Sequence, residues 1–156
     1  MEIDKNRAQA KNNAYSLLRV RPRSEFEITQ RLKLKGYDDS TITQTVNGLK
    51  RRGELDDEKF SRFWVDSRMH LNPVGDCLLR HELKEKGVSD SIIEATLSYK
   101  AKTVDEYKVA FSMAKERFER FKKLDRRKAM KRVYDFLLRR GFKYDTVRKI
   151  IEEIAT

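Results

Sequence analysis

The chain has 156 residues, of which 39% are charged and 38% are hydrophobic. The charged share is well above the quarter that is usual for soluble domains, so we expect a thin core divided among small packed units. Lys and Arg number 36 against 25 Asp and Glu, which gives a net charge of +11. This balance favours a polyanionic partner, meaning nucleic acid, an acidic protein face or an anionic membrane, over a basic surface that binds nothing.

Three features of the sequence bear on the compartment. Cys77 is the only cysteine, so the chain cannot form an internal disulfide, as is usual in a reducing cytoplasm. The chain contains no run of about 18 apolar residues that would predict a membrane span. Residues 1–13 alternate polar and charged side chains and contain no apolar signal segment. We therefore expect a cytoplasmic protein.

Apolar residues recur three and four positions apart along the chain, which is the spacing of one helix face. The clearest stripes lie in residues 130–138 and 147–154, and others lie in 42–49 and 111–121. Only two prolines and six glycines interrupt these stripes, and no segment alternates as a strand does. The sequence therefore predicts helices throughout.

Glycines divide the helical pattern into three similar units. At Gly36, Gly87 and Gly141 a leucine stands four positions earlier and an apolar residue follows directly. The offsets between these glycines are 51 and 54 residues, and an amphipathic stretch follows each one. Glycine adopts the left-handed conformation that ends a helix, and the next apolar residue folds back onto the last turn. One helix–glycine–helix unit is therefore predicted to occur three times.

The signals for helix starts agree with this repeat. Ser24 and Glu27 have the spacing of a capping box. Pro22 and Pro73 each stand 14 residues before the glycine of their unit, and we expect them in first turns, where the missing N–H costs nothing. Asp56 is predicted to cap the first helix of the second unit, with Leu55 and Phe60 placed as a hydrophobic staple.

A leading helix precedes the glycine-ended helix in each unit, which makes nine predicted helices. The predicted fold class is all-α, with three tandem three-helix, helix-turn-helix-like repeats in an elongated, curved array, because helical hairpins in a row bury faces that none buries alone. The predicted leading helices span residues 5–20, 57–70 and 104–122. The predicted domains are the first repeat with the N-terminal helix at 1–54, the second repeat at 55–102 and the third at 103–156, with the last joint at 98–103.

Basic residues cluster in the first and third units. The stretch 115–132 contains ten Lys or Arg and three Asp or Glu, a net +7. Basic groups near helix ends reach phosphates, and the release of counterions then drives binding. A structural role, in which cations complement helix C-termini, stays open for residues 51–52 and 139–140. The predicted contact residues are Arg19, Arg21, Arg23, Lys33, Lys35, Arg51, Arg52, Lys122, Lys123, Arg126, Arg127, Lys131, Arg132, Arg139 and Arg140.

The sequence predicts no catalytic, cofactor or metal site. His81 and Glu82 begin like a zinc-protease helix, but Glu85 stands where the second histidine ligand belongs. The segment 48–53 begins and ends with glycine, but it lacks the Gly-Lys-Ser/Thr ending of a phosphate loop. Acidic pairs in the chain are better explained as helix caps. We therefore expect a protein that is not an enzyme.

Four segments of the chain resemble the RecX family of regulatory proteins. They are PRSEFE at 22–27, LKLKGY at 32–37, GELDDEKF at 53–60 and FLLRRGFKYDTV at 136–147. The LDDEKF part is the most specific, followed by the RGF ending of the third unit, and the resemblance covers about residues 8–154. The departures are Val88 and Phe142, which replace the tyrosine found after the first unit's glycine.

The resemblance implies a regulator of the bacterial recombinase RecA. RecX proteins bind RecA filaments on single-stranded DNA, lodge in the helical groove and inhibit filament extension, ATP hydrolysis, strand exchange and stimulated repressor cleavage. They are not known as enzymes. The resemblance thus makes RecA and the single-stranded DNA within its filament the expected partners of the basic residues, and we expect a monomer without a cofactor. Our hypothesis is a bridge, in which weak contacts of several repeats combine by avidity.

Two other classes of function stay open at this point. Three-helix units with short turns also resemble helix-turn-helix domains, so the chain is alternatively a helical regulator that binds DNA directly without RecA. Such a protein binds naked duplex with a base preference, whereas a filament regulator binds RecA on single-stranded DNA far better than either component alone. A helical adaptor with a purely structural role, the third class, shows little dependence on salt.

Overall fold

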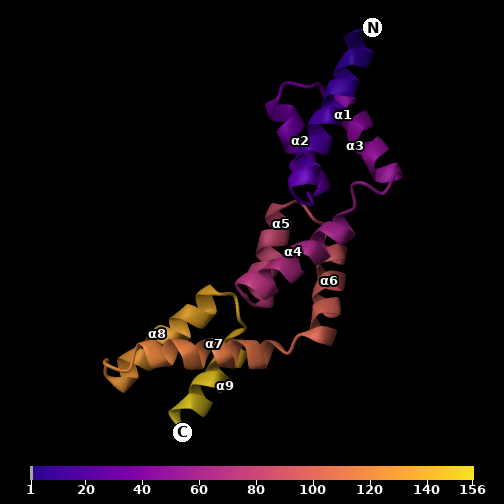
Figure 1. Cartoon of the computed structure of the whole chain (residues 1–156). Coiled ribbons are helices and arrows are strands. Elements are labelled where there is room, and N and C mark those ends of the chain that lie inside the picture. Colours follow the sequence, from indigo (N-terminus) through magenta and orange to yellow (C-terminus); the bar gives the residue numbers. More distant parts are fainter. Residues whose placement is uncertain (1) are drawn as a thin grey trace. The chain divides into compact units, whose positions relative to one another are not determined.

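The computed structural model describes residues 2–156, apart from the side chain of Ile3, and within them the chain forms nine α-helices and no strand (Figure 1). This confirms the predicted all-α fold of tandem three-helix repeats. The helices are α1 (Glu2–Val20), α2 (Glu25–Leu34), α3 (Asp39–Arg51), α4 (Asp57–Leu71), α5 (Asp76–Glu85), α6 (Asp90–Thr103), α7 (Glu106–Arg120), α8 (Arg126–Arg139) and α9 (Tyr144–Ala155).

The chain divides into two compact units. One contains the described residues up to Trp64 together with Leu83–Glu94, and the other contains Val65–Glu82 and Ala95–Thr156. The first repeat, α1–α3, lies wholly in one unit and the third, α7–α9, wholly in the other, whereas each helix of the second repeat contributes to both. The three domain ranges inferred from the sequence stay a prediction.

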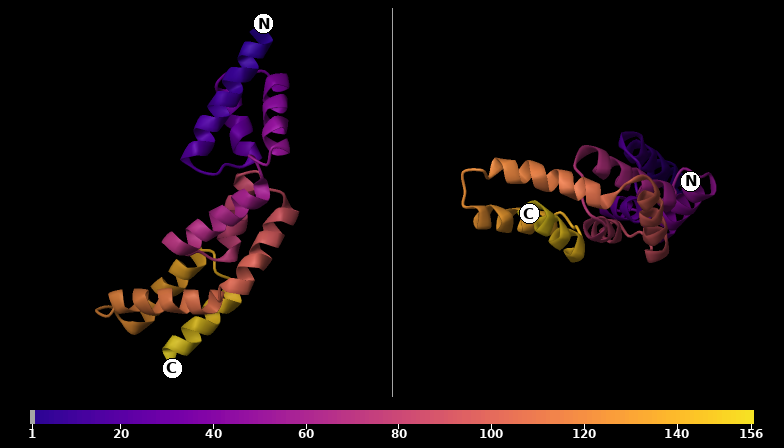
Figure 2. Two further views of the ribbon diagram at one scale, coloured as in Figure 1. Left: turned by 45° about the vertical axis from the view of Figure 1, so that its right-hand side comes forward. Right: turned by 90° about the horizontal axis from the view of Figure 1, so that it is seen from below.

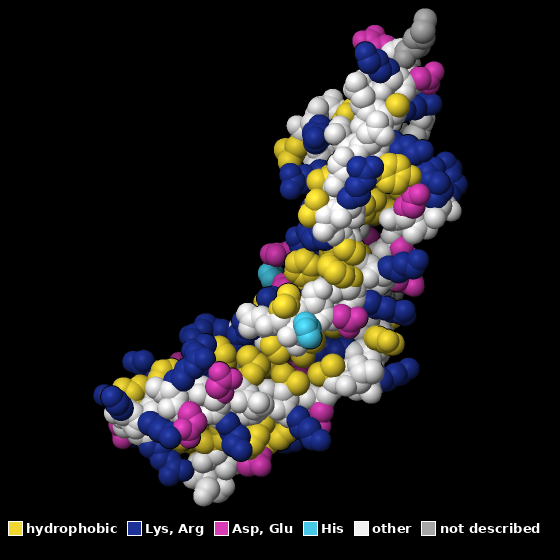
Figure 3. Space-filling model, viewed as in Figure 1, with side chains coloured by type: hydrophobic (Ala, Val, Ile, Leu, Met, Phe, Trp, Pro, Cys, Tyr) yellow, Lys and Arg dark blue, Asp and Glu magenta, His cyan; other side chains and the backbone are white. Residues whose placement is uncertain are grey.

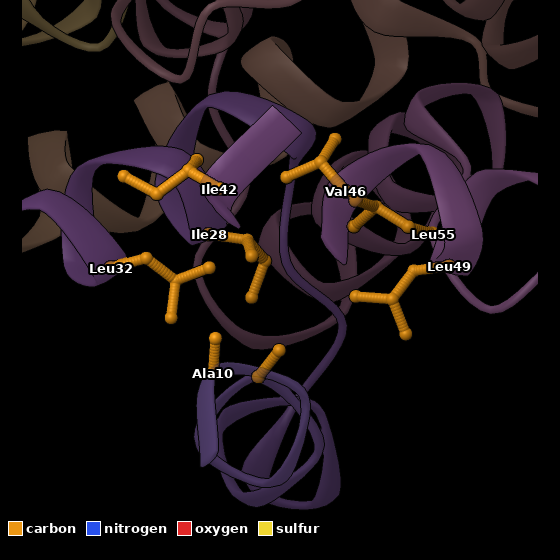
Figure 4. Packing of buried hydrophobic residues seen from close by; sticks show 8 residues of the cluster. Ala10, Ile28, Leu32, Ile42, Val46, Leu49 and Leu55 are labelled. Atoms are coloured by element: carbon orange, nitrogen blue, oxygen red, sulfur yellow. The ribbon is translucent and has the colours of Figure 1, made fainter. Parts of the chain in front are cut away.

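The core of the first repeat collects apolar side chains from three helices, as Figure 4 shows. Alanines on α1 leave room for the larger side chains that α2 and α3 supply. Burying each leucine or isoleucine contributes on the order of 2 kcal/mol, so even this small cluster holds the three helices together. Its buried members are Ala10, Ala14, Ile28, Leu32, Ile42, Val46, Leu49 and Leu55.

The third repeat has a core built in the same way, and α7, α8 and α9 pack against one another in it (Figure 2). Ala110 and Ala114 on α7 stand four residues apart, as Ala10 and Ala14 do on α1. Partly buried aromatic side chains surround the third core, which the sequence stripes predicted. Its buried members are Ala110, Ala114, Val133, Leu137, Phe142, Val147 and Ile150.

The predicted helix-end signals are largely confirmed. Ser24 caps α2 in a complete capping box with Glu27, the two hydrogen bonds measuring 3.1 and 3.2 Å. The Asp56 side chain accepts hydrogen bonds from the first N–H groups of α4. Gly36, Gly87 and Gly141 have φ values of 90°, 74° and 87°, so each ends its helix in the left-handed conformation.

Three local expectations were wrong. Pro22 and Pro73 precede their helices and do not lie in the first turns. Residues 98–103, predicted as a joint, continue α6, and the break falls at Val104 and Asp105. Thr96, Leu97 and Lys100 are buried on one face of this helix, so packing supports a continuous helix through the predicted joint.

The second and third repeats meet where the end of α8 touches the start of α5. The amide of Gly75 donates to the carbonyl of Arg140 at 2.8 Å, and the amide of Cys77 donates to the carbonyl of Gly141 at 3.2 Å. Free N–H groups at the start of one helix are thus satisfied by free carbonyls at the end of another. A Cβ on Gly75 would lie 2.3 Å from the carbonyl oxygen of Gly141, so only glycine fits.

A similar contact joins the end of α5 to the start of α2. The Ser24 hydroxyl donates to the carbonyl of Lys86 at 2.6 Å, and a Cβ on Gly87 would lie 2.4 Å from Cβ of Phe26. By contrast, a Cβ on Gly36 would meet nothing within 4 Å. Gly87 of the second repeat and Gly141 of the third therefore both end a helix and contact the preceding repeat.

Candidate nucleic-acid interface

A groove between α7 and α8, which we call the α7–α8 groove, brings basic and aromatic side chains together. Its volume is about 290 Å³. Three arginines and one carboxylate line it, so its local charge is positive. In Figure 3, Lys and Arg side chains are spread over the visible face of this repeat, among hydrophobic and acidic ones. The lining residues are Arg117, Phe121, Arg132, Asp135, Phe136 and Arg139.

Two guanidinium groups of the α7–α8 groove rest on aromatic rings. The Arg117 guanidinium carbon lies 4.0 Å from the ring centre of Phe136, and that of Arg132 lies 5.6 Å from the ring centre of Phe121. Cation–π contacts hold the guanidinium planes in place without using their N–H donors. Both arginines therefore keep their donors for an anionic ligand such as a phosphate or a carboxylate.

A second hollow of about 480 Å³ adjoins this groove at the turn between α7 and α8 and shares Phe121 and Arg132 with it. Lys122 in this hollow pairs with Glu119 at 2.5 Å. Lys123 lines the same hollow and has no ion pair within residues 2–156. The turn therefore extends the basic surface, with one of its two lysines already neutralised.

The first turns of α8 are basic and contain no acidic residue, although a helix N-terminus favours negative charge. Arg126 donates to the carbonyls of Ile154 and Ala155, so it closes the end of α9. Arg127, Lys128 and Lys131 are exposed, and no ion pair neutralises them in the described part of the chain. These unpaired cations are the ones most available to a polyanion.

The two basic residues at the end of α8 have different surroundings. Arg139 is exposed and lines the α7–α8 groove. Arg140 is half-buried and donates to the carbonyls of Asn72 and Pro73 at 3.0 and 2.7 Å. Burial and the neighbouring Arg68 lower the pKa of Arg140. Its guanidinium links two repeats, so a contact with a partner would compete with these bonds.

The predicted residues Arg21 and Arg23 gather around one carboxylate. Arg21 binds Glu27 through both terminal nitrogens, at 3.2 and 2.5 Å, and Arg23 lies 3.9 Å from the same group. Lys86 reaches Glu27 at 3.6 Å, and both Lys86 and Arg21 lie over the ring of Trp64. This cluster stabilises the junction between α2 and α5, and its side chains are only partly exposed.

The remaining predicted residues of the first repeat are exposed. Arg19 lies in the last turn of α1, and Lys33 lies in the last turn of α2. Lys35 donates to the side chain of Asn13 at 3.3 Å. Arg51 and Arg52 line a groove between α1 and α3 together with basic residues of α1. The structure thus separates the predicted first-repeat residues into a paired cluster and an open groove.

Sequence reasoning missed Arg117 in the third repeat and two basic residues in the first, Arg7 and Lys11. The signal for Arg7 and Lys11 is their spacing of four, which places both on one face of α1. Nothing in the sequence indicates which neighbouring helix that face meets. Arg117 was part of the basic stretch 115–132, but only the packing of α7 on α8 brings it beside Arg132.

The described residues contain neither a membrane-spanning helix nor a cluster of metal ligands. Within 2–156, no helix is both long and apolar enough to cross a membrane. In the same residues, no three His, Cys, Asp or Glu side chains gather as a metal site would require.

Three family models match consecutive parts of the chain. They describe RecX, first three-helix domain, at residues 10–49, RecX, second three-helix domain, at 56–97, and RecX, third three-helix domain, at 105–151. Together the matched ranges cover most of the 156 residues. The chain belongs to the RecX family.

Curated relatives of this RecX family member extend over nearly its whole length. The regulatory protein RecX of Prosthecochloris aestuarii is 33% identical over 153 residues, which is 98% of each chain. The regulatory protein RecX of Chlorobium phaeobacteroides is 33% identical over 141 residues, covering 90% of each. The chain therefore has a RecX regulatory role.

Solved RecX structures have the same fold. A crystal structure of regulatory protein RecX gives a TM-score of 0.84 at 20% identity, covering 97% of this chain and 74% of that one. The crystal structure of RecX from Lactobacillus salivarius gives 0.83 at 21% identity, covering 97% and 98%. At these identities, the likeness bears on the fold and not on particular contact residues.

Proposed function

We propose that this RecX family member binds RecA filaments on single-stranded DNA and inhibits their extension. The same binding restrains ATP hydrolysis, strand exchange and RecA-stimulated repressor cleavage. The protein acts as a monomeric regulator in the cytoplasm, within DNA repair, recombination and the SOS response, and it is not an enzyme. Membership of the RecX family supports the choice of RecA as the partner.

The observation that carries this proposal is the α7–α8 groove with its unpaired cationic neighbours. Arg117 and Arg132 are held by aromatic rings, so their donors are placed before a ligand arrives and less side-chain entropy is lost on binding. Arg127 and Lys131 add exposed positive charge on α8. Such a surface suits the phosphates of the filament's DNA strand and the carboxylates of RecA equally well.

Inhibition then follows from occupancy and requires no chemistry by this chain. A protein held on the filament by several charged contacts covers surface that an added RecA protomer or an incoming DNA strand needs. Because each contact is individually weak, the repeats act together, and the affinity of the whole chain exceeds that of any one repeat.

The test is the DNA-dependent ATPase of RecA, titrated with this protein on single-stranded DNA at two salt concentrations. We expect inhibition that weakens at the higher salt, because counterion release supplies much of the binding free energy. RecA without this chain, and this chain without RecA, are the controls. An ATPase rate that stays unchanged at every ratio of the two proteins contradicts the proposal.

A direct DNA-binding regulator is the alternative outcome. It would bind naked duplex with a base preference, which requires side chains that read base edges in a groove. Fluorescence anisotropy with duplexes of different sequence, compared with RecA-coated single strands, separates the two. Tight and sequence-selective binding to naked duplex, with no gain from RecA, would favour the alternative.

A further inference from the structure

We propose that the groove between α1 and α3 is a second binding site, which takes the phosphodiester backbone of a single nucleic-acid strand. We call it the α1–α3 groove. This proposal rests on the proposed function, because the groove would give the first repeat its own contact with the filament's DNA. Its volume is about 340 Å³. The lining residues are Arg7, Lys11, Gln44, Thr45, Asn47, Gly48, Arg51 and Arg52.

Two facing stripes of side chains build this groove. On α1, Arg7 and Lys11 stand one helical turn apart, and on α3 the residues 44, 47–48 and 51 follow one face at helical spacing. The two helices pack along each other, as Figure 1 shows. In Figure 3, Lys and Arg side chains gather at the C-terminal end of α3. Cations from both walls therefore point to one strip of surface.

One cation of the groove is fixed before any ligand binds. Arg52 donates through its Nε to Glu54 at 3.3 Å, and the Tyr15 hydroxyl donates to the same carboxylate at 2.5 Å. The hydrogen bond from Tyr15 lowers the pKa of Glu54, so this carboxylate stays ionised. The hydrogen bond between Glu54 and Arg52 raises the pKa of the Arg52 guanidinium. The terminal nitrogens of Arg52 are left to face the groove.

The wall beneath Arg52 is bare because Gly48 has no side chain. A Cβ at Gly48 would lie 3.6 Å and 3.7 Å from the two terminal nitrogens of Arg52, so the guanidinium lies along this part of α3. No other side-chain atom of Arg52 lies within 4 Å of this position, so the edge of the guanidinium that carries the terminal nitrogens faces the groove wall at Gly48. Arginine binds phosphate through two such parallel N–H donors.

The other side chains of the groove also suit phosphates. Its lining combines four cations with the polar Gln44, Thr45 and Asn47 and includes no carboxylate. The nearby acids are already engaged, since Glu54 holds Arg52 and Asp38 caps α3 through Thr41. Glu54 offsets the charge of Arg52, so the net positive charge of the groove comes from Arg7, Lys11 and Arg51.

The lining favours a nucleic-acid strand over a protein segment. No aliphatic or aromatic side chain lines the groove, whereas protein partners bury an apolar centre in their interfaces. Two rows of cations along a narrow channel match a single strand, whose phosphates follow each other along one line. In nonspecific single-strand sites a cationic channel follows the backbone, and aromatic side chains stack on the bases. This groove offers only the first of these parts, so its ligand is the phosphodiester backbone and not the bases.

The experiment measures the anisotropy of a labelled oligothymidylate of about 12 nucleotides with the full chain over a range of salt concentrations. The test variant is Arg7→Ala with Arg51→Ala. Each lost phosphate contact lowers the slope of log affinity against log salt by about 0.7, so two contacts lower it by about 1.4 and weaken binding about 25-fold in 0.1 M salt. Circular dichroism verifies that the variant is folded.

The matched control is Lys5→Ala with Arg31→Ala, which removes two exposed charges from the same repeat outside the groove. We expect this control to keep the slope of the unchanged chain. Equal losses in both variants would overturn the proposal, because they would show only the effect of net charge. An abasic phosphodiester oligomer should reproduce the difference between the variants, since the contacts are to phosphate.

Two further outcomes would also overturn it. If inorganic tripolyphosphate displaces the oligomer as effectively as unlabelled oligomer does, the groove takes free polyphosphate and not a strand. If the groove variant binds DNA normally but loses RecA inhibition, the groove faces protein. The anisotropy assay contains no RecA and so tests the groove separately from the proposed function. If the chain binds DNA through the groove but does not inhibit RecA, only the proposed function is wrong. If the groove substitutions change neither DNA binding nor RecA inhibition, only the present proposal is wrong.

Discussion

At the scale of single residues, Glu27 shows how a local signal acquires a second role. Its place in the capping box follows from the sequence, because Ser24 stands three positions before it. Its ion pairs with Arg21 and Lys86 are not predicted by the sequence. Lys86 in particular is remote in the chain, and only the contact between the end of α5 and the start of α2 brings it near Glu27. One carboxylate thus caps a helix and ties two helices together.

The electrostatics of Glu27 predict a pH-dependent contribution to stability. Burial acts to raise its pKa, but the hydrogen bonds from Arg21 and Ser24 and the charge of Lys86 outweigh it, and the net pKa is lowered from 4.5. A carboxylate with a lowered folded pKa stabilises the fold above its unfolded pKa, and that stability is lost as pH falls through the folded pKa.

Replacing Glu27→Gln should therefore lower the free energy of unfolding at pH 7 by about 1–3 kcal/mol, since a charge-assisted hydrogen-bond network is lost. The difference from the unchanged chain should shrink as pH falls below about 4.5. Urea unfolding at several pH values measures it. Glu25→Gln is the control, because Glu25 pairs with Lys50 on the surface at 3.2 Å and should change stability by less than about 0.5 kcal/mol. Equal effects of the two substitutions would contradict this account of Glu27.

At the scale of helices, contacts between helix ends determine which glycines are replaceable. The sequence identifies the glycines that end helices, because the left-handed conformation has a local signature. It does not identify Gly75, whose requirement arises from the backbone of Gly141 and Phe142, far away in the chain. Long-range contacts of this kind are the part of the fold that periodicity does not predict.

Replacing Gly75→Ala should destabilise the unit that contains the start of α5 and the whole of α8 by about 3 kcal/mol. The added Cβ would lie 2.3 Å from the carbonyl oxygen of Gly141 and 2.5 Å from the amide of Phe142, and backbone cannot yield as a side chain does. Hydrogen exchange at the amides of Gly75 and Cys77 should accelerate, since their bonds to α8 break.

Gly48→Ala is the matched control for this change. Gly48 lies inside α3, and its added Cβ would meet only the end of the Arg52 side chain at 3.6 Å. Because alanine is the better helix former, this substitution should leave stability unchanged or raise it by up to about 1 kcal/mol. Similar unfolding curves for the two variants would show that the contact between α5 and α8 is not tight.

Glu106, at the start of α7, has a pKa shift opposite in direction to that of Glu27. The ammonium of Lys100 is almost fully buried and lies 2.6 Å from Asp76, whose amide donates to Glu106 at 3.2 Å. Burial, followed by the charge of Asp76, raises the pKa of Glu106 above 4.5. The folded state therefore holds this proton more tightly, and stability falls as pH rises from about 4.5 through the folded pKa.

Replacing Glu106→Gln should raise the free energy of unfolding near pH 7 by about 1 kcal/mol, because the amide oxygen still accepts from Asp76 without burying a charge. The gain should vanish below about pH 4.5, where the carboxyl is protonated in both states. Thermal unfolding at pH 4 and pH 7 measures the gain, with the exposed Glu116→Gln as control. Lower stability of the variant at pH 7 would mean that attraction to Lys100 outweighs the cost of burial.

At the scale of the whole molecule, composition and repeats predicted more than single positions did. The excess of positive charge, the three glycine-ended units and the all-α fold were available from the sequence because each is spread over many residues. The grooves were not, because each joins side chains from two helices whose pairing the sequence leaves open. Arg132 and Arg139 were predicted, but Arg117 beside them was not.

The two grooves predict how charge neutralisation should affect RecA inhibition. If both grooves bind the filament, their contacts are linked because they belong to one chain, and the binding free energies of the two grooves add. Arg132→Ala with Arg139→Ala in the α7–α8 groove should weaken inhibition about 25-fold in 0.1 M salt, and Arg7→Ala with Arg51→Ala should do the same. The chain carrying all four substitutions should lose about 600-fold, as the product of the two effects.

The measurement is the concentration of this protein that halves the RecA ATPase rate on single-stranded DNA. Lys108→Ala with Lys149→Ala is the control for the third repeat, since both lysines are exposed and lie outside the α7–α8 groove. A chain in which only one groove matters would show the full loss from one pair of substitutions and none from the other. That result would leave a single anchoring surface, and the bridging hypothesis would be wrong even if RecA inhibition itself is observed.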